Sequence, residues 1–167
     1  MKNIAFIGMP GCGKTRISLM VARKLKCAWH DCDSIIEQRE YRTIAEIFAQ
    51  SGEEYFRNCE TELIRELLSG SGAVISTGGG AVLRNADILR DRAVVVYLHR
   101  DIELIAQAIE ASSDDTRPLL NGGTERLYEL YKQRRELYES TMHICVDNNS
   151  GVDEAVDRVV EALAEWV

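Results

Sequence analysis

The chain has no long apolar run, and this excludes several classes of protein. No stretch of its 167 residues approaches the roughly 18–20 consecutive apolar residues that a membrane-spanning helix needs. The N-terminal segment MKNIAFIG contains one lysine and a short apolar run, which is too short for a secretory signal peptide. We therefore expect a cytoplasmic protein with no membrane partner.

Paired cysteines and metal-ligand motifs are also missing. The cysteine count is odd and no C-x-x-C pair occurs; the cysteines are Cys12, Cys27, Cys32, Cys59 and Cys145. The three histidines show no ligand spacing with them. We expect reduced thiols, and neither a disulfide framework nor a zinc site.

Basic residues are outnumbered by acidic ones. The 20 Lys and Arg residues stand against 27 Asp and Glu residues, for a net charge of −7. An acidic surface argues against nucleic acid as a partner, because a phosphate backbone needs a basic face. An anionic small-molecule substrate would have to be bound by a few local cations. The length fits a single domain, residues 1–167, which we expect to be monomeric.

Short apolar runs alternate with helical patterns along the chain. The runs lack the polar alternation of a half-exposed strand, as expected for strands covered on both faces. They are Ile4–Ile7, Ala28–Trp29, Ala73–Ile75, Ala93–Leu98 and Ile144–Val146. This alternation predicts an α/β fold, a parallel sheet of about five strands with helices on both sides. The carboxyl ends of the strands would then share one edge, where ligands bind.

Two segments do not follow the core pattern. Residues 33–60 contain short, polar and charged helices, which we interpret as a substrate-binding insertion. Residues 111–124 are polar and rich in glycine at their end, which is typical of a mobile lid or of an ordinary surface loop. Arg117 within this segment favours the lid.

The strongest motif follows the first apolar run. The segment GMPGCGKT matches the phosphate-loop pattern G-x-x-x-x-G-K-[ST] between a predicted strand and a predicted helix. The backbone of Gly11, Cys12 and Gly13 would approach the phosphate oxygens, and the N–H groups at the helix start would point at the anion. Lys14 would reach the β- and γ-phosphates of ATP, and the hydroxyl group of Thr15 would bind Mg²⁺.

Arg16 follows this motif, at a position where a second small hydroxyl residue facing the α-phosphate is more usual. Its guanidinium group either turns outward or adds a contact to the phosphates, and the sequence leaves both open. We include Arg16 among the candidate ATP-binding residues.

Two carboxylates, Asp31 and Asp33, end the second apolar run. Alternate residues at a strand end point the same way, so both side chains can face the nucleotide. One would hold Mg²⁺, directly or through water, and the other would accept the proton of an attacking hydroxyl group. The alternative is a helix N-cap, because Asp33 and Ser34 precede an apolar pair that can begin a helix.

Further motifs follow in order, and together with the phosphate loop they resemble the shikimate kinase family over nearly the whole chain. They are Asp31-x-Asp33, Gly52-Glu53-x-x-Phe56-Arg57-x-x-Glu60, Gly78-Gly79-Gly80, Arg117-Pro118-Leu119-Leu120 and Arg134-x-x-x-Tyr138. The resemblance implies a fold of the nucleoside-monophosphate-kinase type. It also implies transfer of the γ-phosphate of ATP to the 3-hydroxyl group of shikimate, which gives shikimate 3-phosphate and ADP in aromatic amino-acid biosynthesis.

The resemblance implies how the acceptor is bound. Asp33 would bind the ring hydroxyl groups of shikimate and act as the base. Arg57 and Arg134 would bind its carboxylate, since guanidinium groups form bidentate, charge-assisted bonds with carboxylates. The backbone of Gly79 would supply a hydrogen bond, and its neighbours complete the list of glycines expected at the substrate: Gly78, Gly79 and Gly80.

The resemblance also implies how ATP and Mg²⁺ are bound. Arg117, on the lid, would close over the nucleotide and share the catalytic work with Lys14. Asp31 would lie near the metal, with Thr15 as the other protein ligand. The chain departs from the family pattern on the adenine side, because residues 104–110 and 147–151 lack the basic residues expected there.

Other interpretations stay open. Taken singly, Arg57 and Arg134 are each more typical of a solvated helix face, and only the spacing to Tyr138 selects Arg134 over Arg135. Fold alone does not fix function, so a kinase of another small polyol carboxylate or of a nucleotide is an alternative. A catalytically weak nucleotide-binding module is a third.

Overall fold

The computed structural model describes residues 1–111 and 123–166. Most of the predicted lid, residues 111–124, lies outside the described residues, and so does Arg117. The strands are β1 (Asn3–Ile7), β2 (Ala28–Asp31), β3 (Ala73–Ser76), β4 (Ala93–His99) and β5 (Ile144–Asp147). The helices are α1 (Lys14–Leu25), α2 (Cys32–Glu40), α3 (Ile44–Ser69), α4 (Val82–Arg92), α5 (Ile102–Ala111), α6 (Gly123–Thr141) and α7 (Val152–Leu163).

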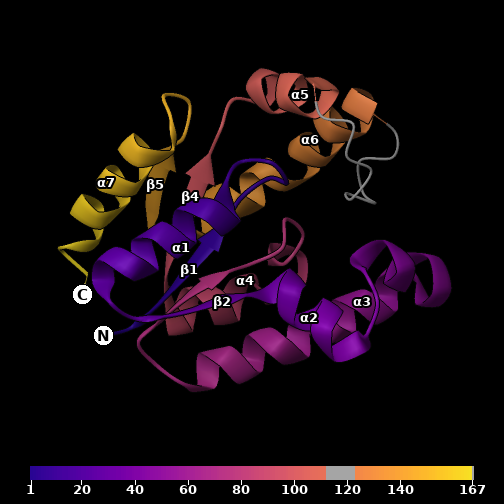
Figure 1. The fold of residues 1–167 in the computed structure, drawn as a ribbon, viewed down its shortest axis with the longest axis horizontal. Helices are drawn as coiled ribbons and strands as arrows, with labels where there is room; N and C mark the ends of the chain where they lie inside the picture. The colour runs from indigo at the N-terminus through magenta and orange to yellow at the C-terminus, as the bar shows by residue number, and fades with distance from the viewer. Residues whose placement is uncertain (112–122, 167) are drawn as a thin grey trace.

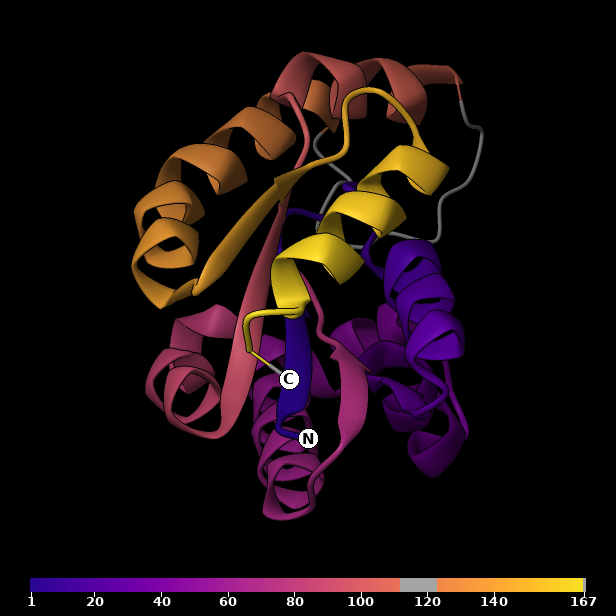
Figure 2. The ribbon, with the colours of Figure 1, turned by 90° about the vertical axis from the view of Figure 1, so that its left-hand side faces the viewer.

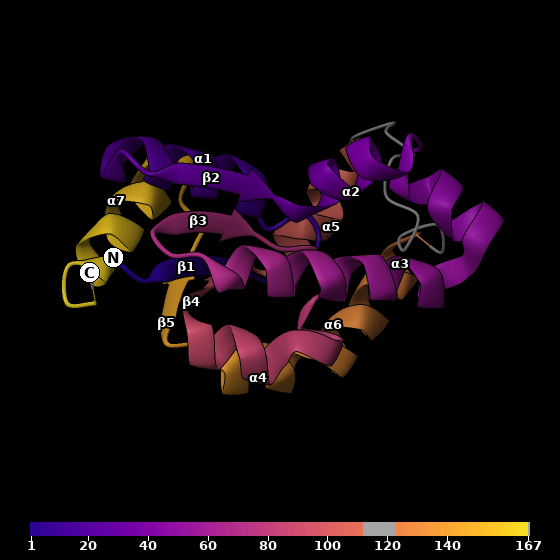
Figure 3. The same cartoon turned by 90° about the horizontal axis from the view of Figure 1, so that it is seen from below.

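The strands form one parallel sheet in the order β2-β3-β1-β4-β5. Helices lie on both faces of this sheet (Figures 1 and 3): α1 and α7 cover one face, and α3, α4 and α6 cover the other. This arrangement confirms the predicted α/β fold. Because the strands all run in one direction, their carboxyl ends lie along one edge, where ligands of such sheets bind.

The centre of the sheet is buried on both faces, and its edges are not. Every residue of β1 is buried, and so is every residue of β4 except His99. The prediction that all five strands are covered on both faces is wrong for the edge strands, since β2 is only partly buried and Cys145 on β5 is exposed. An edge strand has a neighbour on one side only, so part of it stays open to water.

α2 and the first part of α3 project beyond the carboxyl edge of the sheet (Figure 1), whereas the rest of α3 lies along the sheet (Figure 3). α3 begins with a capping box, in which the side chains of Thr43 and Glu46 each accept a hydrogen bond from the other's backbone N–H group. Gly52 interrupts α3 with φ 85° and ψ 167°, a conformation that other residues rarely adopt. Beyond Gly52 the helix runs to Ser69 without another break, so residue 60, the expected end of the insertion, lies inside it.

The C-terminal helix packs against the first one. Val156, Val159 and Leu163 on one face of α7 are buried in the core, as the 3.6-residue spacing of these apolar residues requires. The two chain ends lie near each other, away from the loops of the carboxyl edge (Figure 2). Among the described residues, no helix combines the length and apolar character needed to cross a membrane.

Candidate active site

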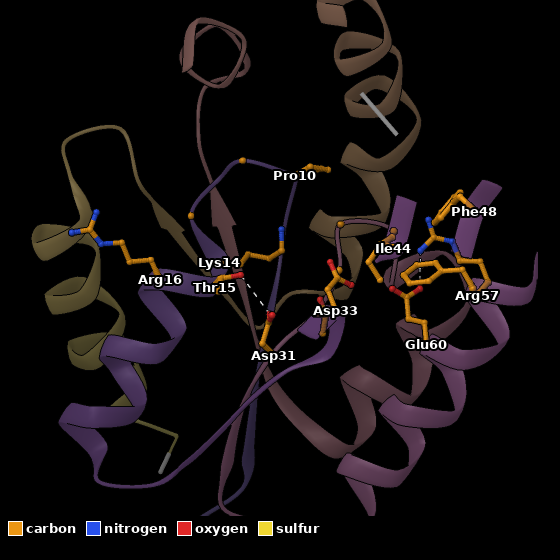
Figure 4. Close-up of a pocket in the computed structure, with 17 residues that line it drawn as sticks. Pro10, Lys14, Thr15, Arg16, Asp31, Asp33, Ile44, Phe48, Arg57 and Glu60 are labelled. Atoms are coloured by element: carbon orange, nitrogen blue, oxygen red, sulfur yellow. Dashed lines mark hydrogen bonds and ion pairs between the residues drawn. The ribbon is translucent and has the colours of Figure 1, made fainter. Parts of the chain in front are cut away.

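A cavity of about 400 Å³ opens at the carboxyl edge of the sheet (Figure 4). The phosphate loop and the start of α1 form one end of it, and α2 and α3 form the other. Most of the residues predicted from the sequence line it: Gly11, Gly13, Lys14, Thr15, Arg16, Asp31, Asp33, Arg57, Gly78, Gly79 and Gly80. Two predicted residues, Cys12 and Arg134, are buried and do not line it.

The phosphate loop has the backbone shape that anion binding needs. Gly8, Gly11 and Gly13 have positive φ angles of 148°, 84° and 100°, which are accessible at little cost only to glycine. α1 begins directly after the loop, at Lys14, and the unpaired N–H groups of its first turn give this end a partial positive charge. The ammonium group of Lys14 is buried and donates to the carbonyl oxygens of Gly8 and of the next residue, at 2.7 Å and 3.0 Å.

Two residues that the sequence did not single out hold this loop in place. Asn148, just after β5, donates from Nδ2 to the carbonyl oxygen of Cys12 at 2.8 Å, and its side chain occupies the space that a Cβ on Gly13 would need. Arg100, just after β4, donates from Nη1 to the carbonyl oxygen of Gly11 at 3.3 Å. The segment 147–151 therefore braces the loop, although it lacks the basic residue expected there.

Asp31 caps a helix and lies beside Thr15. It is the N-cap of α2, accepting hydrogen bonds from the backbone N–H and the hydroxyl group of Ser34 at 3.3 Å and 2.7 Å. The cap is therefore Asp31 and not Asp33, which lies in the first turn of the helix. The hydroxyl group of Thr15 lies 3.4 Å from the other carboxylate oxygen of Asp31.

The oxygen atoms of Thr15 and Asp31 suit a hard cation whose other ligands are water and phosphate oxygens. Among the described residues, no cluster of three or more His, Cys, Asp or Glu side chains could hold a metal ion by itself. Mg²⁺ commonly keeps several waters and takes one or two protein oxygens together with phosphate oxygens. Thr15 and Asp31, beside the phosphate loop, fit such a site.

Asp33 faces the cavity with a carboxylate that has few partners. Its Oδ1 atom is buried and makes no hydrogen bond within the described part of the chain. Burial, with a smaller effect of the nearby carboxylates of Glu60 and Asp31, raises the pKa of Asp33 to about 7, although Lys14 opposes the shift. A carboxylate with such a pKa can take up a proton near neutral pH.

Arg57 is not on a solvated helix face. Its side chain is only 5% exposed, and it donates to Glu60 at 2.8 Å and to Glu53 at 3.3 Å. Glu60 is itself buried, which raises its pKa, and the positive charges of Arg57 and Arg134 partly oppose this shift. The sequence offered Glu60 as a partner of Arg57 only on a solvated helix face; the spacing of three residues indicated the pair but not its burial.

The structure separates the two adjacent arginines of α6. Arg134 is buried, whereas Arg135 is exposed and pairs with Glu139 at 3.0 Å. The spacing to Tyr138 therefore selected the buried arginine correctly. Arg134 also has a buried Nη1 atom without a hydrogen-bond partner among the described residues.

The three glycines after β3 connect the two ends of the cavity. A Cβ on Gly79 would lie 2.7 Å from Pro10 of the phosphate loop, and the Gly79 carbonyl accepts a hydrogen bond from the hydroxyl group of Tyr138. A Cβ on Gly78 would lie 2.8 Å from Glu60 Oε2, and one on Gly80 would collide with the guanidinium group of Arg57. The sequence indicated that a ligand approaches these glycines closely. The structure shows that side chains of the site itself do so.

Comparison with known proteins gives a consistent family. The family model described as "Shikimate kinase" matches residues 10–164. A shikimate kinase of Clostridium botulinum (strain Eklund 17B / Type B) is 41% identical over 166 residues, covering 98% of both chains. One of Dictyoglomus turgidum is 40% identical over 168 residues with the same coverage. The solved structure of a shikimate kinase from Acinetobacter baumannii in complex with shikimate is similar with a TM-score of 0.91 and 34% identity, covering 100% of this chain and 96% of that one.

Proposed function

This chain belongs to the shikimate kinase family, whose members phosphorylate shikimate with ATP, and we propose that its cavity transfers the γ-phosphoryl group of ATP to the 3-hydroxyl group of shikimate. The observation that carries the proposal is the charge balance at the acceptor end. Two buried guanidinium groups, of Arg57 and Arg134, lie near the buried carboxylate of Glu60, while the other carboxylate that pairs with Arg57, that of Glu53, is half exposed. Buried cations require anions, and the carboxylate of shikimate would supply a further one to this arginine pair.

The acceptor end also has the shape for a small ring. Ile44 and Phe48, from the part of α3 before Gly52, line the cavity together with Arg57 from the part after it (Figure 4). Apolar walls with a few charged groups are typical of sites for small polar ligands. This supports the interpretation of residues 33–60 as the substrate-binding part of the domain.

The proton of the acceptor passes to Asp33 in this proposal. Asp33 lies between Lys14, at the phosphate end, and Arg57, at the acceptor end (Figure 4). As the 3-hydroxyl oxygen attacks the γ-phosphorus of ATP, its proton moves to the carboxylate of Asp33 and the bond to the β-phosphate oxygen breaks, which releases ADP. Lys14 balances the negative charge of the transferred group.

Mg²⁺ at Thr15 and Asp31 would neutralise charge on the phosphate oxygens of ATP when it is bound. The protein residues fix where that charge lies, because the positive-φ glycines and the start of α1 hold the phosphates beside Lys14. Arg117, outside the described residues, is proposed to close over the nucleotide.

A coupled assay of ADP release with shikimate tests the function. Arg57→Ala should lower kcat/KM for shikimate by about 10- to 100-fold, since a charged hydrogen bond is lost, and it should change the KM for ATP little. Arg65→Ala removes an exposed cation from the same helix and serves as the control. Equal losses for both substrates, or no turnover of shikimate by the parent protein, would show that the acceptor is wrong.

A further inference from the structure

Outside the cavity, one guanidinium group joins three segments of the acceptor end. Arg42 lies in the short connection between α2 and α3. Its Nη2 atom donates to Glu40, the last residue of α2, at 3.1 Å, and its Nη1 atom donates to Gln50 at 3.1 Å. Its Cζ atom also lies 5.4 Å from the centre of the Tyr55 ring, in a cation–π contact. We call these four side chains the Arg42 cluster.

The Arg42 cluster bridges the break that Gly52 makes in α3. Gln50 belongs to the part of α3 before Gly52, and Tyr55 belongs to the part after it. Gly52 has non-helical φ and ψ angles, so the regular backbone of a helix does not fix the angle between the two parts. Side chains that touch both parts have to fix it, and the guanidinium group of Arg42 touches both.

The Arg42 cluster is better shielded from water than an exposed surface ion pair. The side chains of Arg42 and Glu40 are only 19% and 21% exposed, so water screens their attraction less than it screens an exposed pair. A planar guanidinium group can use its edge for hydrogen bonds and its face for an aromatic ring. Arg42 does both, and removing its side chain would break all three contacts in one step.

The part of α3 that the cluster holds forms one wall of the acceptor end. Ile44 and Phe48 line the cavity, and the ring of Phe48 lies 5.1 Å from that of Phe56, which follows the break. In the part of the chain that the structure describes, the members of the Arg42 cluster do not line the cavity. The cluster therefore acts on a ligand in this cavity through the position of the wall.

We propose that Arg42 is a positioning residue for the acceptor: it holds the first part of α3 at the angle at which Ile44 and Phe48 close on the ring of shikimate. The inference deepens the proposed function and rests on it for the identity of the acceptor. Without Arg42 the first part of α3 would adopt several angles, and only a fraction of the molecules would be ready to bind shikimate. The apparent affinity falls by that fraction, whereas the phosphate loop, at the other end of the cavity, keeps its affinity for nucleotide.

Calorimetric titration with shikimate and with MgATP, each alone, tests the inference. Arg42→Ala should weaken shikimate binding by about five- to tenfold, as expected when a half-shielded ion pair and a cation–π contact no longer hold the wall. The dissociation constant of MgATP should change by less than about twofold, because the phosphate loop does not depend on the angle within α3.

Tyr55→Ala removes the ring of the cluster and no charge. It should also weaken shikimate binding, by about two- to fivefold, which a mere loss of positive charge near an anionic ligand does not explain. The double variant with Arg42→Ala should lose less than the product of the two single effects, because both substitutions remove the same contact.

Arg39→Ala is the matched control. Arg39 also joins α2 to α3, through two hydrogen bonds of 2.9 Å to Glu66, but Glu66 lies in the part of α3 after Gly52. This variant removes the same charge, and a link between the same two helices, without loosening the break. Both dissociation constants should therefore stay at the values of the parent protein.

Amide hydrogen exchange of the unliganded protein measures the wall without any acceptor. In Arg42→Ala, the amides of residues 47–51 should exchange faster than in the parent protein, because local opening of this part of α3 becomes easier. The amides of residues 57–68, in the long part of α3 after the break, should keep the rates of the parent protein.

Unchanged shikimate binding in Arg42→Ala, an equal loss in Arg39→Ala, or an equal loss of affinity for MgATP would each overturn the inference. If the parent protein does not bind shikimate while exchange at residues 47–51 accelerates in Arg42→Ala, the proposed acceptor is wrong and Arg42 positions the wall for another one. If the parent protein phosphorylates shikimate and Arg42→Ala binds it normally, the proposed function stands and this inference fails.

Discussion

At the scale of single residues, Asp33, the proposed base, should determine the pH range in which the enzyme works. Because its pKa is raised to about 7, the base is mostly protonated and inactive in mildly acidic solution. We expect kcat/KM for shikimate to rise with pH, with a midpoint near 7, and then to level off. Steady-state assays from about pH 5 to about pH 9 measure this profile. Asp33→Asn should lower kcat/KM by about 10²- to 10⁴-fold and abolish the rise; a flat profile in the parent protein would contradict the assignment of Asp33 as the base.

Single residues also show what the sequence could predict about the site. The phosphate loop is contiguous, so its residues and their placement followed from the motif alone. Arg134 could be selected over Arg135 because Tyr138, one helical turn further on, packs on the same side and bonds to Gly79. The bracing by Asn148 could not be predicted, because it joins Cys12 to a residue 136 positions away.

At the scale of elements, the segment after β3 fixes the distance between the phosphate loop and the acceptor end. Gly79→Ala would place a methyl group 2.7 Å from Pro10, so the loop or the segment has to shift. We expect a loss of about 1–3 kcal/mol in the free energy of unfolding, as for other overpacked sites, together with a higher KM for ATP.

Gly70→Ala is the control for this prediction. Gly70 has φ −88° and ψ −168°, which any residue adopts, and a Cβ there would meet nothing nearer than 3.7 Å. Denaturant unfolding and ATP kinetics should find it close to the parent protein. A Gly79→Ala protein with unchanged stability and ATP kinetics would mean that the segment adapts and does not set this distance.

Gly52 sets the direction of the first part of α3. Its φ of 85° is unfavourable for a side chain, and a Cβ there would touch nothing within 4 Å, so Gly52→Ala would act through the backbone alone. We expect a loss of about 1–3 kcal/mol in stability and a higher KM for shikimate, because Ile44 and Phe48 would move relative to Arg57. Kinetics and unfolding of Ser51→Ala, one residue earlier in the helix, provide the comparison; a KM increase for ATP alone would contradict this role.

The elements themselves were largely predictable, and their boundaries less so. The five apolar runs became the five strands, because strands at the centre of a sheet need side chains that are apolar on both faces. The strand ends, at Asp31, Ser76, His99 and Asp147, extend beyond the runs, since the last residues of a strand reach the polar carboxyl edge. The length of α3 was missed because polar and charged residues are frequent at 44–58, where Ile47 is the one buried residue of the helix before Phe56.

At the scale of the whole molecule, the stability of the fold is linked to the ionisation of Asp33. Its folded pKa of about 7 exceeds the reference value of 3.8, so the folded protein binds this proton more tightly than the unfolded chain does. The contribution of Asp33 to the free energy of unfolding is therefore fully present below about pH 4 and is lost as the pH rises to about 7. Each unit of pKa difference corresponds to about 1.4 kcal/mol.

Asp33→Asn removes the free-energy cost of holding an ionised carboxylate in this buried place. It should therefore stabilise the protein at pH values where Asp33 is ionised. We expect a gain of about 1–3 kcal/mol in the free energy of unfolding at about pH 8, which diminishes towards about pH 4. Urea unfolding at several pH values measures it. Asp87→Asn, at an exposed position on α4, should show no comparable gain, and a destabilised Asp33→Asn protein at about pH 8 would contradict the linkage.

The three consecutive glycines limit how this enzyme can change its acceptor. Each of them lies close to a different group of the site: Gly78 to the oxygens of Asp33 and Glu60, Gly79 to the ring of Pro10, and Gly80 to the guanidinium group of Arg57. A larger residue at Gly79 would disturb the phosphate loop, and one at Gly78 or Gly80 would disturb the acceptor end. Divergence towards new acids, in nature or in the laboratory, is therefore open mainly at Ile44 and Phe48, which line the acceptor end of the cavity.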